Sequence, residues 1–321
     1  MFMQRFKSWQ LFAVCVLVWA TTWHAVTYQI TPIAPEIAVA LRFGLAGALL
    51  VAACALRGLR LRFSLRDHGL LALQGAFLYG VSYVSVYYAE RHIASGLVAV
   101  GYSASPLITG LGAYALFGIA VGPRFVVGGL LGMAGVALIF WPEFGKATAG
   151  AGVALGAAFT IASVFLSAVG SLAASRNRSR PLPFWPALGY GMLYGAAACL
   201  AIGLLRGESL ALPTAAAWWL SLAYLVLAGS VLTFTCFLTL QDRIGPGPTG
   251  SIGVMTPLLA LLVSVALEGY RPDWFTGVGA ALAVIGNALM LRRGPIVRWS
   301  GGAWNRRRRA GMPGAAAPAP D

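Results

Sequence analysis

IASGLVAVGYSASPLITGLGAYALFG, residues 93–118, returns in altered form as IGPGPTGSIGVMTPLLALLVSVALEG, residues 244–269. The two stretches align without a gap at a spacing of 151 positions, and the similarity continues as far as residues 138 and 289. Leucine and alanine are common throughout the chain, so the matched prolines and glycines are the stronger evidence. They include Pro106/Pro257, Gly96/Gly247, Gly118/Gly269, Gly128/Gly279 and Gly135/Gly286. The chain is therefore predicted to contain an internal repeat.

Hydropathy predicts a protein that lies in a membrane. Of the 321 residues, 59% are hydrophobic and only 10% are charged, and the mean hydropathy is +0.78. A helix needs about 20 apolar residues to cross the hydrocarbon core of a bilayer. We predict an all-α integral membrane protein with ten transmembrane helices, over residues 9–29, 36–56, 68–88, 94–117, 124–141, 150–172, 184–205, 215–240, 246–267 and 273–291.

The basic residues predict how the chain is oriented. Most of the 23 lysines and arginines fall at the N-terminus, in the loops after the second and sixth spans, beside the fifth and eighth spans, and after the tenth. The opposite side holds only Arg91, Lys146, Arg206 and Arg271, and Arg42 lies within a span. Short cytoplasmic loops carry an excess of lysine and arginine. Both termini are therefore expected in the cytoplasm, with the spans in the inner (plasma) membrane.

The repeat and the number of spans together predict two five-helix halves, residues 1–145 and 150–292, followed by a basic, Pro/Ala-rich cytoplasmic tail over residues 293–321. Because five is odd, the second half must enter the membrane in the opposite orientation to the first. Inverted repeats of this kind are typical of secondary transporters. Such proteins bind their substrate near the bilayer midplane, between the two halves, and open alternately to the two sides.

Composition disfavours several other classes of function. A net charge of +14 would suggest nucleic acid in a soluble protein, but here the bases flank the spans and orientation explains them. The four cysteines lie inside apolar runs without a metal-ligand spacing, so no metal or other cofactor is expected. No nucleotide-binding glycine loop followed by lysine is present. Scattered histidines and mostly loop-borne acids disfavour an enzyme, and the lack of a soluble signalling domain disfavours a receptor.

Two prolines are the first candidates for a substrate site. Pro106 and Pro257 each stand near the middle of a span, where proline removes one helical hydrogen bond and frees the carbonyl four residues earlier, such as that of Tyr102. In hydrocarbon the freed carbonyl needs another partner, and the hydroxyls of Ser105 and Thr256 are close in sequence. We predict that these residues line a polar cavity, and the alternative is an ordinary helix kink.

The ionisable residues inside spans are the second group. His24 and Arg42 are candidate substrate-binding residues, because such side chains face the protein interior or water. The alternatives are a histidine that is only hydrogen-bonded and an arginine that extends to the membrane surface. Glu90 and Glu268 stand at span ends and are expected at the surface. No span carries a paired-carboxylate proton site, so proton coupling is left open, as is homodimer formation.

The remaining candidates are aromatic or carry hydroxyls. They share helix faces: Tyr79 and Tyr83 in the third span, Trp19 and Trp23 in the first, and Thr160 and Ser163 in the sixth. A buried tyrosine or tryptophan needs a partner for its polar atom, which suits a cavity wall or a packed helix interface equally. The hydroxyl face of the sixth span also suits hydrogen bonding between helices.

The order of these motifs resembles the drug/metabolite transporter superfamily, in its ten-helix EamA-like branch. The residues behind the resemblance are Trp19-Ala-Thr-Thr-Trp23, Arg42-Phe43, Ile93-Ala-Ser-Gly-Leu-Val98, Ser105-Pro106, Gly128 through Ala137, Thr256-Pro257 and Gly279 through Gly286. The resemblance covers about residues 9 to 292. It implies a carrier that moves a small metabolite through the lipid bilayer, most often by exporting amino acids or related compounds.

One feature departs from the pattern of the family. The family often ends its fourth and ninth spans with a Gly-Glu pair, whereas Phe117-Gly118 has no acid here and Glu268-Gly269 has the reverse order. The role that these acids have in the family is therefore not transferred to this chain. Within transport, the alternatives to amino-acid export are import and broad-specificity drug export.

Overall fold

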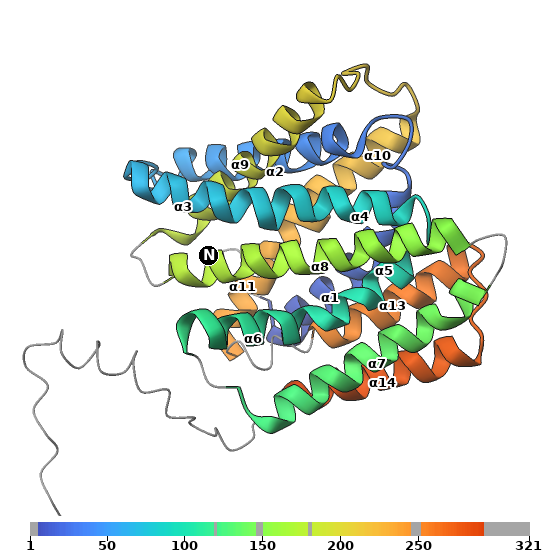
Figure 1. The fold of residues 1–321 in the computed structure, drawn as a ribbon. Helices are drawn as coiled ribbons and strands as arrows, with labels where there is room; N and C mark the ends of the chain where they lie inside the picture. The colour runs from blue at the N-terminus through green and yellow to red at the C-terminus, as the bar shows by residue number, and fades with distance from the viewer. Residues whose placement is uncertain (1–5, 119–120, 146–149, 179–181, 245–251, 292–321) are drawn as a thin grey trace, which may run out of the picture.

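The structure is a bundle of membrane-length helices (Figure 1). A computed structural model describes residues 6–118, 121–145, 150–178, 182–244 and 252–291, and all of its regular structure is helical. Seven spans are single helices: α1 Ser8–Thr27, α2 Pro35–Leu56, α7 Pro123–Gly145, α8 Gly150–Arg178, α9 Phe184–Leu205, α13 Ile252–Leu267 and α14 Trp274–Leu291. The expected tail, residues 293–321, lies outside the described residues.

Three spans change helix type along their length. The third span consists of α3 Leu65–Gly75, the π-helix η2 Ala76–Val81 and α4 Ser82–Glu90. The fourth span consists of α5 Ser95–Gly101, the 3-10 turn η3 Tyr102–Ala104 and α6 Ser105–Phe117. The eighth span consists of α10 Ala216–Tyr224, the π-helix η4 Leu225–Leu232 and α11 Thr233–Ile244. Eight spans are long and apolar enough to cross a membrane, and two shorter apolar helices, Met255–Leu267 and Trp274–Met290, complete the ten within the described chain. The prediction of ten spans is confirmed.

The two halves also match in local structure outside the stretch in which their sequences match. α3 and α10 begin 151 positions apart, as do α7 and α14, and both third spans of the halves contain a π-helix. Gly118 and Gly269, also 151 apart, both have a left-handed φ, 66° and 68°, where their helices end. A left-handed residue at this position closes a helix, and glycine adopts that conformation without steric cost.

Small residues allow the two halves to pack closely. α7 packs along α14, and α2 packs along α9 (Figure 1). Where α7 crosses α14, Gly128 meets the carbonyl of Gly286 and Gly135 meets that of Gly279, so that a Cβ on any of these glycines would overlap the partner backbone. Lipid tails are as apolar as side chains, and helices in membranes therefore associate through close packing of this kind.

The outer surface is apolar and the interior holds the polar groups. Large hydrophobic side chains such as Leu56 and Leu220 are exposed on the outside, as expected for helices in contact with lipid. Glu36, Arg42 and Ser82 are buried inside the bundle. Polar side chains in this position line cavities or pair with one another.

Candidate substrate-binding site

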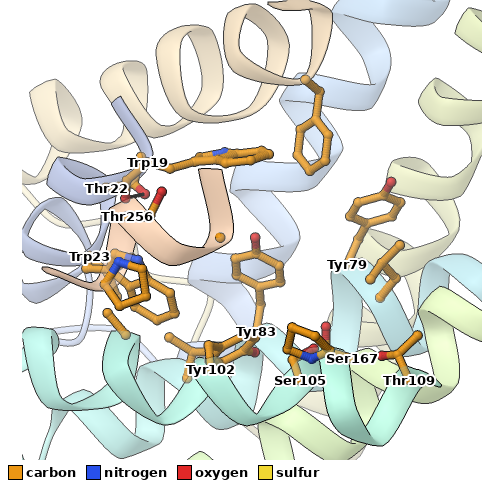
Figure 2. A pocket seen from close by; sticks show the side chains of 18 of the residues that line it. Trp19, Thr22, Trp23, Tyr79, Tyr83, Tyr102, Ser105, Thr109, Ser167 and Thr256 are labelled. Carbon is orange, nitrogen blue, oxygen red and sulfur yellow. Dashed lines mark hydrogen bonds between the residues drawn. The ribbon is translucent and has the colours of Figure 1, made fainter. Parts of the chain in front are cut away.

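A cavity of about 440 Å³ lies between the two halves (Figure 2). Its wall comes from the first half through α1, α2, the third span and the fourth span, and from the second half through α8, α11 and α13. The lining residues are Trp19, Thr22, Trp23, Val26, Arg42, Leu78, Tyr79, Tyr83, Val86, Ala99, Tyr102, Ser105, Pro106, Thr109, Ser167, Phe234, Gly253, Thr256 and Pro257. Most of the residues predicted from the sequence are therefore brought together in one wall.

Aromatic side chains from different helices hold one another in this wall. The Trp19 ring lies edge-on to Phe234 with 5.5 Å between centroids, and the Trp23 ring lies edge-on to Tyr102 at 5.2 Å. The Trp19 indole N–H donates a hydrogen bond to the Gly229 carbonyl, 3.3 Å away in the π-helix η4. π-helical turns are often found at functional sites. The two contacts of Trp19 connect α1, in the first half, to the eighth span of the second half.

Arg42 is the only charged residue among the described residues that line the cavity. Its side chain comes from α2 and is buried at 3% exposure, so it does not extend to the membrane surface. The guanidinium carbon lies 5.0 Å from the ring centroids of both Phe43 and Tyr83, within the range of a cation–π interaction. Its Nε atom is buried and has no hydrogen-bond partner among the described residues. The cavity therefore contains one positive group set among aromatic rings.

The two prolines act differently. Next to Pro106 the span breaks into the 3-10 turn η3, and Ser105 and Pro106 begin α6 facing the cavity (Figure 2). Pro257 lies inside the continuous helix α13, and Gly253, four residues earlier, lines the cavity together with Thr256. The Thr256 hydroxyl is buried and has no hydrogen-bond partner in the described chain, which leaves an unsatisfied polar group at this wall.

Three predicted residues lie outside the wall of the cavity. Thr160 and Ser163 donate hydrogen bonds within α8, to the carbonyls of Gly156 and Thr160 at 2.8 Å each. Ser163 also lies within hydrogen-bonding reach of Tyr102, behind the wall. His24 points away from the cavity to Glu268, with 3.0 Å between Nδ1 and Oε1.

His24, Ser95, Ser264 and Glu268 form a hydrogen-bonded group that we call the His24–Glu268 cluster. The backbone N–H of Ser95 and the Ser264 hydroxyl both donate to Glu268 Oε2 at 3.0 Å, and the Ser95 hydroxyl donates to Oε1. The Gly96 N–H donates to the Ser264 hydroxyl at 2.8 Å. The cluster joins α1 and α5 of the first half to α13 of the second.

The expectation that Glu90 and Glu268 lie at the surface was wrong. The Glu268 side chain is only 13% exposed, and Glu90 as a whole is 6% exposed. The ends of their helices meet inside the bundle, and a linear sequence does not show which span ends face each other. Burial alone would raise the pKa of the Glu268 carboxyl, but the hydrogen bonds from Ser95, His24 and Ser264 hold its pKa below the usual value.

A second hollow of about 250 Å³ extends from the cavity toward the opposite end of the bundle, where α1 and α3 begin. It shares Leu78, Tyr79 and Phe234 with the cavity. On its far side Asn177 of α8 donates a hydrogen bond to the Gln74 carbonyl oxygen at 2.9 Å. The second hollow thus continues the cavity at one end of the bundle, and the His24–Glu268 cluster links the two halves at the other.

Sequence reasoning missed several hydroxyls in the wall. Thr22 and Thr109 stand one helical turn from predicted residues, on the same faces as Trp19 and Ser105, so the helical period could have found them. Ser167 belongs to the same hydroxyl face of α8 as Thr160 and Ser163, and it is the member of that face that reaches the cavity. Phe234 carries no signal of this kind, because nothing in its neighbourhood distinguishes it from a lipid-facing residue.

The fold and the cavity define a class: a membrane protein of two five-helix halves with a cavity between them. The sequence model of the EamA-like transporter family matches residues 7–141 and 154–292. The chain therefore belongs to the EamA-like transporter family, whose members are transporters and not enzymes.

Relatives agree with this assignment. The chain is 29% identical over 292 residues to YedA of Escherichia coli (strain K12), described as an uncharacterized inner membrane transporter, and 88% of each chain is covered. The YedA proteins of E. coli O6:H1 and O157:H7 match equally well. A solved crystal structure of another protein superposes with a TM-score of 0.64 at 22% identity, over 88% of this chain and 95% of that one, which shows a shared fold. The chain is accordingly a multi-pass inner membrane protein.

Proposed function

We propose that the protein exports amino acids or related small carboxylates from the cytoplasm by alternating access. The observation that carries the proposal is Arg42, a single buried cation in a cavity wall of aromatic rings. A guanidinium binds a carboxylate through two parallel hydrogen bonds, and these bonds are strongest where water is excluded. The rings of Trp23 and Tyr83 offer apolar surface for the rest of the molecule.

The size and polarity of the cavity support a compact substrate. About 440 Å³ falls in the range of pockets that hold small molecules. The hydroxyls of Thr22, Ser105, Thr109 and Thr256 are the further polar groups of the wall that suit an ammonium or a hydroxyl of the substrate. The resemblance to EamA-like carriers implies the same substrate class.

The difference between the two ends of the cavity supports export. The hollow that continues the cavity leads to the end where α1 begins, and the excess of basic residues predicts that this end faces the cytoplasm. In this arrangement a substrate is loaded from the cytoplasm while the His24–Glu268 cluster seals the far side. Opening of the cluster would then release it outside.

The test is efflux from liposomes. Purified protein is sealed in liposomes loaded with a mixture of amino acids and one cationic drug, and the loss of each compound is followed by mass spectrometry against empty liposomes. We expect the selective loss of a few amino acids, slowed about tenfold or more by Arg42→Gln, because a hydrogen bond to a charged group contributes about 1.5–3 kcal/mol. Arg124→Gln, which removes an exposed arginine outside the cavity, is the matched control and should transport normally.

Two results would contradict the proposal. Loss of the drug without any amino acid would support drug export instead. Normal efflux by Arg42→Gln would show that Arg42 does not bind the substrate. Import is separated from export by adding the same compounds outside, under the same gradients, and comparing the two rates.

A further inference from the structure

Glu90, at the end of α4, is a buried acid without a hydrogen-bond partner. It is 6% exposed, and neither carboxylate oxygen has a partner among the described residues. Glu36 is buried as deeply but is satisfied, because it accepts hydrogen bonds from Tyr88 at 3.1 Å and from Arg206 at 3.1 Å. An unpaired charge is costly in such a place, and a carboxylate removes the cost by binding a proton.

The groups that face Glu90 connect it both to the cavity and to the His24–Glu268 cluster. The charges that act on it are Glu268, in the His24–Glu268 cluster, and Arg42, in the cavity wall. Tyr87 on its own helix and Tyr102 on η3 are the neighbouring phenols. α8 packs along α4 and carries no ionisable residue between residues 153 and 167. The ionisable residue that α1 brings near is His24, which is hydrogen-bonded to Glu268.

Glu90 stands just behind the substrate cavity. Val86, one helical turn earlier on the same face of α4, lines the cavity, as does Arg42. The positive charge of Arg42 favours the ionised form of Glu90, whereas the nearby charge of Glu268 opposes it. A substrate carboxylate on the Arg42 guanidinium would offset this favourable charge and so make the ionised form of Glu90 less favourable.

We infer that Glu90 is a proton-binding site coupled to the cavity through Arg42, and that it takes up one proton when a carboxylate occupies Arg42. A proton from water joins a Glu90 carboxylate oxygen and forms a carboxylic acid, with no other bond changed. The coupling is reciprocal, so protonation of Glu90 strengthens carboxylate binding by the same factor. Substrate and proton then cross together and leave Glu90 ionised after release.

This inference rests on the proposed function for the identity of the substrate, but the proton site itself can be tested without one. Infrared difference spectra of the purified, empty protein are recorded between about pH 8 and about pH 5, a range in which exposed carboxyls stay ionised. We expect the carbonyl band of a buried carboxylic acid to appear in the wild type and to be missing in Glu90→Gln. Glu36→Gln is the matched control, a buried acid with partners, and should retain the band.

Two infrared results would overturn the inference: no such band in the wild type, or an unchanged band in Glu90→Gln. If Glu90→Gln does not fold, Glu90→Asp replaces it. The aspartate variant keeps a carboxyl at this position and should show the band displaced along the pH axis.

Coupling is tested in liposomes that contain a pH-sensitive dye and the amino-acid mixture. In the wild type we expect the lumen to become more alkaline as a substrate leaves, while Glu90→Gln moves substrate without the pH change. Substrate loss without alkalinisation in the wild type would overturn the coupling but leave the proposed function intact. If no amino acid leaves at all, the proposed function fails, and the infrared result alone decides whether Glu90 is a proton site.

Discussion

His24 on α1 and Glu268 at the end of α13 meet across the two halves of the protein, with 3.0 Å between Nδ1 and Oε1. Ser95 and Ser264 add three further hydrogen bonds to the same carboxylate. The contacts that His24 and Ser95 make with Glu268 would break if the halves separated at this end, whereas the Ser264 contact lies within the second half. The cluster is therefore suited to hold one of the two arrangements that alternating access needs.

The first prediction concerns pH and this cluster. The pKa of Glu268 is lower in the folded protein than its usual value, so the ionised form stabilises the fold and this stabilisation is lost as pH falls through the lowered pKa. We expect the melting temperature of the wild type to begin to fall below about pH 5, near the usual pKa of a glutamate, and to fall further as the pH drops toward the lowered pKa. Glu268→Gln should melt lower at neutral pH and show a flatter pH dependence. Light-scattering or fluorescence melting in detergent measures both.

A surface acid is the control for this experiment. Glu208→Gln removes a carboxyl that contacts only Arg206, at 3.6 Å near the surface. Its melting curve should follow the wild type at each pH. If Glu268→Gln also follows the wild type, the cluster does not contribute to stability in the manner described.

The second prediction separates the ring of Tyr83 from its hydroxyl. The Arg42 guanidinium lies 5.0 Å from this ring, and the Phe43 ring lies 4.7 Å from it. Tyr83→Phe keeps the ring and should leave the KM for the transported amino acid within a few-fold of the wild type. Tyr83→Ala removes a ring that orients the Arg42 guanidinium and offers apolar surface to the substrate, and it should raise KM about tenfold or more, as the loss of about 1.4 kcal/mol of binding would. Initial rates of efflux over a range of substrate concentrations give both values.

An equal increase in KM for the two Tyr83 variants would contradict this interpretation. It would show that the hydroxyl, and not the ring, is what the site uses. The melting temperature of each variant, measured beside the wild type, excludes a general loss of folding.

Much of the fold was predictable because it depends on local properties of the sequence. Spans are set by runs of apolar residues, and the boundaries at Phe117 and Pro123 confirmed the separation of the fourth and fifth spans. The helical period also brought Tyr79 and Tyr83 correctly to one face. The repeat was visible where prolines and glycines mark it, but not in the second and third spans, where only the structure shows matching helix types.

The polar contacts between distant spans were not predictable. Glu90, Glu268 and Arg42 come from three different spans, and hydropathy does not say which span ends face each other in the bundle. His24, a candidate for substrate binding with a hydrogen-bonded role as the alternative, is paired with Glu268 outside the cavity wall. A buried charge requires a partner, yet the identity of the partner depends on tertiary packing alone.

The third prediction concerns Pro257 and the carbonyl it frees. Pro257→Ala restores an N–H that can bond to the Gly253 carbonyl in the cavity wall. The helix should become more stable, and the melting temperature should rise or stay unchanged. The cavity loses a free acceptor, so efflux should slow about threefold to tenfold, in line with the loss of about one hydrogen bond. Efflux rates and melting curves are measured on the same preparations.

Pro142 provides the matched control for this change. It also lies inside a helix, α7, but does not line the cavity. Pro142→Ala should raise stability in the same way and leave efflux unchanged. A similar loss of efflux in both variants would indicate a general effect of stiffening the bundle, and Pro257 would have no special role.

The last prediction tests the close crossing of α7 and α14. A Cβ on Gly279 would lie 2.5 Å from the Gly135 carbonyl oxygen and 3.1 Å from the Ile139 amide nitrogen, and backbone atoms cannot move aside as a flexible side chain can. Gly279→Ala should therefore destabilise the fold by about 1–3 kcal/mol, although alanine is the better helix former. Gly277, two residues earlier on the same helix, faces open space, and Gly277→Ala should leave stability unchanged or slightly raised.

The crossing also predicts how two changes combine. Gly135→Ala would overlap the same partner from the other side, because its Cβ meets the Gly279 carbonyl. Once one alanine has forced the helices apart, the Cβ of the second alanine overlaps the opposite backbone less. The double variant should thus lose less stability than the two single losses together, whereas Gly277→Ala combined with Gly135→Ala should be additive. Additive losses for the Gly135 and Gly279 pair would mean that the two helices do not cross at these glycines.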